Sequence, residues 1–149
     1  MPRKALVAIA CAAAFAAGCT SSPTIVQRFD EGPWAGSAPF SESARAGHLL
    51  YVSGQVGDDA SGNLVEGGIV PETHQVMANI QAILARRGLS LGNVVKCTVF
   101  LVDIEDWPTF NTIYTSYFER PYPARSALGA NGVALDGRLE LECIAAYPD

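Results

Sequence analysis

The sequence lacks most of the motifs that identify common enzymes and binding proteins. It has no Walker phosphate-binding loop, no GxGxxG dinucleotide signature, no HExxH metal motif and no GxSxG nucleophile elbow. Its 4 cysteines form no CxxC motif or Cys/His cluster, so we expect no metal site. Basic residues are scarce, with 10 Lys and Arg against 15 Asp and Glu, and the net charge of −5 excludes a basic nucleic-acid-binding surface.

The composition nevertheless predicts a folded protein. Of 149 residues, 49% are hydrophobic and 17% are charged, which excludes a largely disordered chain. The 14 glycines follow no fixed period, so a collagen-like fibre is also excluded. No internal repeat is visible, and the length favours a single domain.

The N-terminal segment differs from the rest of the chain. Two basic residues, Arg3 and Lys4, precede an uncharged, Ala-rich run over 5–17, too short to span a bilayer, and small residues stand directly before Cys19. This pattern resembles a bacterial lipobox and predicts a signal peptide over 1–18, a lipid on Cys19 and a lipidated tether over 19–35. The domain would follow over 36–149, anchored at the membrane of the bacterial cell envelope and facing the periplasm. Two alternatives are secretion with cleavage elsewhere and a buried Ala-rich helix with an incidental cysteine.

The remaining cysteines bear on whether the protein is exported. Cleavage before Cys19 would discard Cys11 and leave Cys97 and Cys143, each in a strand-like run. An oxidising compartment permits a disulfide between these two residues, but two buried, reduced thiols are the interpretation we favour. Cleavage would also change the net charge to −7 over the 131 residues that remain.

Hydrophobic periodicity predicts alternating strands and helices. Strands are expected over 49–55, 93–102, 125–130 and 139–147, the second of them a central strand covered on both faces; Gly54 inside the first suggests a bulge or a close backbone approach. A first helix is expected over 71–87, ended by Gly88. A second helix should begin near Glu105, because apolar residues repeat at helical spacing over 110–118.

Few residues are candidates for chemistry. His48 and His74 have no Ser or Cys partner at a recognisable spacing, so we interpret both as surface or satisfied histidines. Arg125 follows a proline-restricted turn, which would hold its guanidinium in a direction suited to a carboxylate, and Glu140 could exchange a proton with water. On physical grounds alone, an Arg125–Glu140 ion pair that stabilises the sheet is the simpler interpretation.

From about Pro39 onward, the chain resembles the RidA family of enamine/imine deaminases. The matching segments, in the family's order, are 51–55, 75–88, 94–103, 111–118, 123–126 (Pro-Ala-Arg-Ser) and 140–145 (Glu-Leu-Glu-Cys-Ile-Ala). The resemblance implies an α+β, chorismate-mutase-like fold, with a mixed six-stranded sheet and two helices packed on one face. It also implies a homotrimer with a ligand site at each subunit interface, which hydrolyses 2-imino acids of the 2-aminoacrylate type to 2-keto acids and ammonia. No cofactor and no nucleic acid are implied, and the only membrane contact would be the lipid anchor.

The resemblance also assigns roles to individual residues. Arg125 matches the carboxylate clamp and Glu140 matches the acid that orients or activates water, with Glu142 as its rival on the same strand face. The positions that match the substrate pocket are Phe40, Ser53, Gly54, Asn111, Pro123 and Ala127. Ala127 stands where the family often has Cys, and Phe40 where it often has Tyr. An alternative is a non-catalytic trimer of the same fold that binds small carboxylates.

Overall fold

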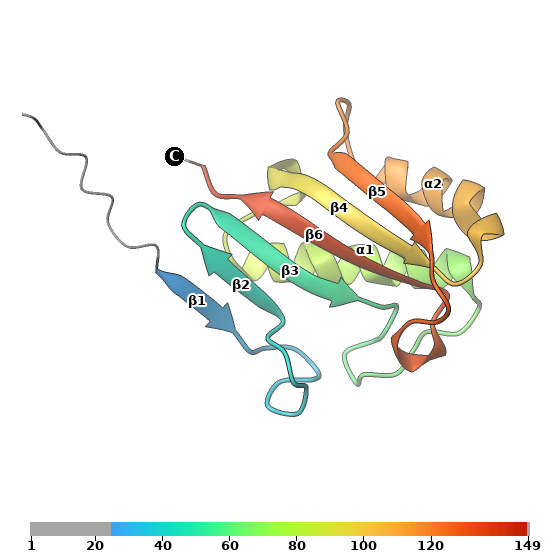
Figure 1. The fold of residues 1–149 in the computed structure, drawn as a ribbon, viewed down its shortest axis with the longest axis horizontal. Helices are drawn as coiled ribbons and strands as arrows, with labels where there is room; N and C mark the ends of the chain where they lie inside the picture. Colours follow the sequence, from blue (N-terminus) through green and yellow to red (C-terminus); the bar gives the residue numbers. More distant parts are fainter. Residues whose placement is uncertain (1–24, 149) are drawn as a thin grey trace, which may run out of the picture.

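A computed structural model describes residues 25–148 of the chain, and its central element is a six-stranded mixed sheet (Figure 1). The strands are β1 (Val26–Phe29), β2 (Ser43–Ala46), β3 (Leu49–Gln55), β4 (Val94–Leu101), β5 (Ala124–Gly129) and β6 (Leu139–Ala146). Their order across the sheet is β1-β2-β3-β6-β4-β5, and only the β4–β5 pair is parallel. The predicted fold class is therefore confirmed.

Two helices cover one face of this sheet. Helix α1 (Ile69–Arg86) packs against β3, β6 and α2, and α2 (Trp107–Ser116) lies beside it behind β5 (Figure 1). Helix α1 ends as expected, because Gly88 adopts a left-handed φ of 70° that suits the residue after a C-cap. A short 3₁₀ turn, Ile104–Asp106, occupies the predicted start of the second helix, so α2 begins slightly later than expected. Two further 3₁₀ turns span Leu91–Asn93 and Ala134–Asp136.

The strands alternate between a buried face and an open face. In β6, Leu139, Leu141 and Cys143 are buried under the helices, whereas Glu140 and Glu142 lie on the opposite face. The prediction that the second strand is covered on both faces is wrong for a single chain. Val95 of β4 is 49% exposed, because the helices protect only one side of the sheet.

The first two strands are shorter and less apolar than the rest. Strand β1 pairs with β2, and β2 pairs with β3, both antiparallel. Strand β1 lies within 19–35, so the sheet begins before the domain boundary that we predict at residue 36. The predicted signal peptide over 1–18 and the predicted lipid site at Cys19 lie outside the described residues. Within residues 25–148, no helix has the length and hydropathy needed to cross a bilayer.

The two buried cysteines correct another prediction. Cys97 of β4 lies directly opposite Cys143 of β6, with a Cα–Cα distance of 4.1 Å, and the two form a disulfide. We expected reduced thiols because the residue pattern of each strand predicts only that its cysteine is buried. The register between the two strands, which brings the sulfur atoms together, is not readable from either strand alone.

Candidate functional site

Arg125 is held at the edge of the sheet by helix α2. It begins β5 just after Pro123, and its Nη2 donates a hydrogen bond of 2.5 Å to Asn111 Oδ1. The guanidinium also lies 4.7 Å from the centre of the Tyr114 ring and 5.3 Å from that of Phe110. Among the described residues Arg125 forms no salt bridge, so its remaining N–H groups are free to bind an anion.

Tyr114 adds a second polar group beside Arg125. Its side chain is almost fully buried, and its hydroxyl has no hydrogen-bond partner within the described part of the chain. Burial raises the pKa of this phenol, while the positive charge of Arg125 acts in the opposite direction. Tyr114 therefore keeps its proton at neutral pH and can donate it to a bound oxygen atom.

Glu140 occupies a different environment near the end of β6. Burial raises the pKa of its carboxyl group, the charge of Glu142 raises it further, and a hydrogen bond from the backbone of Ala134 partly offsets both effects. A raised pKa brings a carboxylate closer to the range in which it can accept and return a proton at neutral pH.

Gly54 leaves the space that the Glu140 carboxyl group fills. A Cβ atom at Gly54 would lie 2.6 Å from Glu140 Cδ and nearer still to Oε1. The register between β3 and β6 shifts between Val52 and Gln55, so both interpretations of Gly54, a bulge and a close approach, are confirmed.

Arg125 and Glu140 do not meet within one chain. Strand β4 lies between their strands, with Cys97 opposite Arg125 and Phe100 opposite Glu140. Arg125 shares the helix-covered face with Cys97, whereas Glu140 projects from the open face. The alternative of an ion pair between these two residues is therefore wrong for the described chain.

The predicted pocket residues divide in the same way. Asn111, Pro123 and Ala127 lie near Arg125, and Ala127 packs against the core. Phe40, Ser53 and Gly54 lie on the other side, with Glu140. Phe40 lines both a shallow depression that includes Ser53 and Glu142 and a deeper cavity that includes Gly54 and Glu140.

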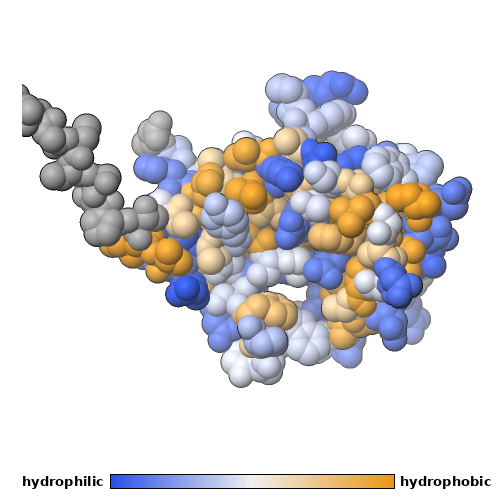
Figure 2. Space-filling view, in the orientation of Figure 1, coloured by the Kyte–Doolittle hydropathy of each residue, from blue (hydrophilic) through white to orange (hydrophobic). Residues whose placement is uncertain are grey.

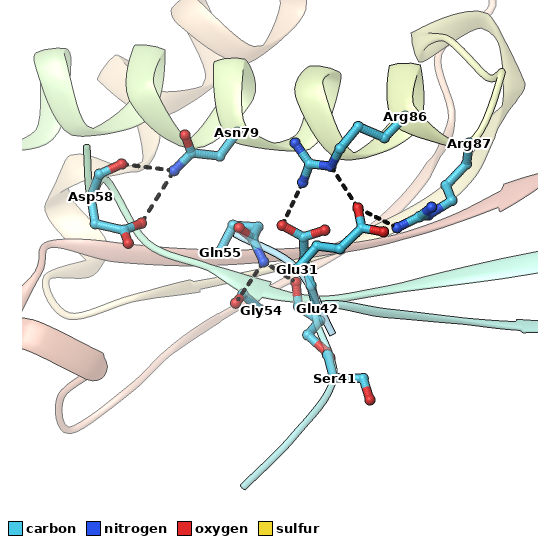
Figure 3. A network of polar contacts seen from close by, with 10 residues as sticks. Glu31, Ser41, Glu42, Gly54, Gln55, Asp58, Asn79, Arg86 and Arg87 are labelled. Atoms are coloured by element: carbon cyan, nitrogen blue, oxygen red, sulfur yellow. Dashed lines mark hydrogen bonds and ion pairs between the residues drawn. The ribbon is translucent and has the colours of Figure 1, made fainter. Parts of the chain in front are cut away.

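The deeper cavity, of about 830 Å³, lies under the loop that joins β1 to β2 (residues 30–42) and reaches helix α1. Trp34 in this loop donates an indole N–H hydrogen bond to Asp58. Asn79 of α1 also donates to Asp58, as Figure 3 shows. None of these three residues was among the predicted site residues, and Trp34 lies in the segment before residue 36 that is predicted to be a tether. A tryptophan within a Gly- and Pro-rich stretch was the one available signal of a structured loop.

The histidines agree with their expected surface positions. His48 and His74 are both exposed, and His74 Nδ1 lies 2.8 Å from the Tyr117 hydroxyl. In residues 25–148, no group of three or more His, Cys, Asp or Glu side chains has an arrangement that could hold a metal ion.

Comparison with known proteins identifies the family. The sequence profile of the endoribonuclease L-PSP family matches residues 33–147, and the chain belongs to this family, which includes RidA. The cattle protein named 2-iminobutanoate/2-iminopropanoate deaminase is 43% identical over 112 residues, which cover 74% of this chain and 82% of that protein.

Two solved structures show the same fold. The crystal structure of yeast Mmf1 superimposes with a TM-score of 0.78 at 34% identity and covers 83% of this chain and 100% of Mmf1. RidA from an Antarctic Psychrobacter superimposes with a TM-score of 0.73 at 34% identity, over 80% of this chain and 96% of that chain.

Proposed function

We propose that this protein is an exported imine deaminase that hydrolyses 2-imino acids to 2-keto acids and ammonia. The observation that carries the proposal is the presence of two suitable groups on one chain. Arg125 has no acidic partner among the described residues, and the carboxyl group of Glu140 has a raised pKa. The cattle relative, named for the deamination of 2-iminobutanoate and 2-iminopropanoate, supports the same chemistry.

The proposed reaction needs few groups because an imine carbon is already electrophilic. Arg125 binds the substrate carboxylate through parallel N–H groups and so fixes the imine carbon. With the imine nitrogen protonated, Glu140 removes a proton from water as its oxygen attacks that carbon, which gives a neutral tetrahedral aminoalcohol. Glu140 then returns the proton to nitrogen. As the C–N bond breaks and ammonia leaves, the hydroxyl group gives its proton back to the Glu140 carboxylate and the C=O bond forms.

A second copy of the chain would complete the site. Because Arg125 and Glu140 lie on different faces of one sheet, a single substrate can contact both only if they come from two chains. Hydrophobic side chains are scattered over the open face (Figure 2). Tyr51 and Leu128 are both exposed, and a neighbouring copy would cover them. We therefore infer a homotrimer with one site at each interface, and sedimentation of the protein lacking residues 1–19 tests it. A monomer at micromolar concentration would contradict the trimer.

Ammonia release tests the reaction itself. An amino-acid oxidase generates the imino acid in the assay, and the protein should accelerate loss of the imine over its spontaneous hydrolysis. Arg125→Ala and Glu140→Gln should each abolish this acceleration. Binding of 2-keto acids without turnover would instead favour the alternative, a non-catalytic trimer that binds small carboxylates.

Mixing two inactive variants tests whether the site is shared. If Arg125 and Glu140 act from different chains, trimers assembled from equal amounts of Arg125→Ala and Glu140→Gln contain some interfaces with both native groups. Random assembly then restores about a quarter of the native activity. Activity that stays at zero after verified subunit exchange would contradict a composite site.

The proposal of export has independent support. The disulfide between Cys97 and Cys143 is typical of proteins that fold in an oxidising compartment. A lipid on Cys19 would supply several acyl chains, which is enough for stable anchoring. Incorporation of labelled palmitate in cells should be lost in Cys19→Ser, and unchanged labelling would contradict the anchor.

The family name also suggests RNA cleavage. A net charge of −7 for the chain without residues 1–18 opposes binding to a polyanion, so we do not propose this activity.

A further inference from the structure

The cavity next to Glu140 is far larger than a methyl-bearing imino acid requires. Its volume of about 830 Å³ falls within the range of about 300–1,000 Å³ that is typical of sites for drug-sized ligands. Figure 2 shows an opening on the open face of the molecule, between β3 and the β1–β2 loop. Glu140 and Gly54 lie among the residues that line the cavity, so the proposed reacting end of the substrate adjoins this space.

Apolar side chains from three parts of the chain surround the cavity. Trp34 and Phe40 come from the β1–β2 loop, Ala82 and Ile83 from α1, and Leu135 from the turn before β6. Leu135 has a φ of 59°, a left-handed conformation that is uncommon for a residue other than glycine. Backbone strain of this kind is concentrated at ligand-binding positions, and here it accompanies a leucine that lines the cavity.

Two charged side chains that line the cavity, Arg86 and Asp58, already have partners within the chain. Arg86 binds Glu31 and Glu42, which fastens the β1–β2 loop to α1 (Figure 3). Asp58 accepts hydrogen bonds from Trp34 and Asn79.

The charged side chains that line the cavity therefore do not select an anionic ligand. Arg86 is the only cation among the described residues that line the cavity, and it is already paired. An anionic side chain would face Asp58, Asp59 and Glu140 without a partner.

We propose that this cavity receives the side chain of the substrate and that the protein prefers 2-imino acids with a large apolar or aromatic side chain. The inference rests on the proposed function, since it places the imine carbon at Glu140 and the carboxylate on Arg125. The side chain then extends past Phe40 toward Trp34, Ala82 and Leu135, where it loses contact with water.

Competing substrates measure this preference directly. Amino-acid oxidases supply the imines of phenylalanine, alanine and glutamate to the full-length protein, and semicarbazide traps whatever imine the protein has not hydrolysed. We expect kcat/KM for the phenylalanine imine to exceed that for the alanine imine about 10-fold or more, because each buried methylene contributes to discrimination. The glutamate imine should be the poorest substrate of the three.

A matched pair of helix variants locates the effect. Ala82→Phe fills the cavity from α1 and should lower the ratio of phenylalanine-imine to alanine-imine kcat/KM about 10-fold. Ala85→Phe changes an exposed position of the same helix outside the cavity lining and should leave this ratio unchanged. If Ala82→Phe does not fold, calorimetry on the native protein replaces it, and phenylpyruvate should then bind about 10-fold more tightly than pyruvate.

Each outcome is decisive. Preference for the alanine imine, an unchanged ratio in folded Ala82→Phe, or equal binding of the two keto acids would overturn the substrate inference and leave the deaminase function intact. Failure to hydrolyse any of the three imines would instead refute the proposed function, and the substrate inference with it.

Discussion

Replacing Gly54 with alanine would test how closely the Glu140 carboxyl group must be placed. The new Cβ would stand 2.6 Å from Glu140 Cδ and 2.9 Å from Cγ, both shorter than the 3.0 Å that real Cβ contacts respect. The glutamate side chain must therefore swing away from β3 by about 1 Å, a misplacement that costs on the order of 100-fold in rate. We expect kcat for 2-imino acids to fall by about that factor in Gly54→Ala.

The stability of this variant should change much less than its activity. The φ of Gly54 is not in the left-handed region, so alanine adopts the native backbone without strain. Gly129→Ala is the matched control, because Gly129 also lies in a strand and a Cβ there meets no atom within 4 Å. The assay is loss of trapped imine at saturating substrate, with urea unfolding measured in parallel.

Replacing Glu140 with the shorter aspartate should restore part of the activity that Gly54→Ala loses. In Gly54→Ala/Glu140→Asp the carboxylate is one methylene nearer its own backbone, which relieves the contact with the new Cβ. We expect the double variant to be more active than the product of the two single effects predicts. Native turnover in Gly54→Ala would refute the argument that this carboxyl group must stay where Gly54 allows it.

Three further predictions concern the groups around the site. Arg125→Lys keeps the positive charge but loses the planar fork, so kcat/KM should fall by about 10–100-fold; an unchanged value would refute bidentate binding of the carboxylate. Glu142→Gln removes a negative charge that raises the pKa of Glu140. Because Glu140 must be deprotonated to act as a base, the acidic limb of the kcat/KM profile should move to lower pH. Glu119→Gln, at an exposed position, is the control and should not move it. If Glu142→Gln abolishes turnover and Glu140→Gln does not, Glu142 rather than Glu140 is the group that activates water. Cys97→Ala/Cys143→Ala opens a loop with a sequence separation of 46, so the free energy of unfolding should fall by about 2–4 kcal/mol in urea denaturation, and native protein equally stable with and without reductant would contradict a structural role for this disulfide.

Local features of the fold were predictable from the sequence because neighbouring residues determine them. The helices followed from periodic apolar residues, the end of α1 followed from Gly88, and strands β3, β4, β5 and β6 followed from their hydrophobic patterns. Strand β2, Ser-Ala-Arg-Ala, was missed because its small side chains give no alternation of large apolar and polar residues. Strand β1 was missed because its residues are mostly exposed at the sheet edge.

The arrangement of the site could not be predicted in the same way. The sequence of β5 shows that Arg125 alternates with Ser126, and that of β6 shows that Glu140 alternates with Leu141. Neither sequence shows whether Arg125 and Glu140 project from the same face of the sheet, because this depends on the register of both strands with β4. The same dependence explains why the pairing of Cys97 with Cys143 was not foreseen.

The attachment of the β1–β2 loop to helix α1 has a practical consequence for shortened forms of this protein. A chain trimmed to residue 33, where the family match begins, would lose Glu31 and so both of its salt bridges to Arg86 and Arg87. It would also lose Phe29, whose ring lies 3.8 Å from the Arg87 guanidinium, and with it the strand that covers the edge of β2. An uncovered strand edge is a template for pairing with other chains. The shortened protein would therefore keep every proposed catalytic residue and yet aggregate more readily than the longer chain.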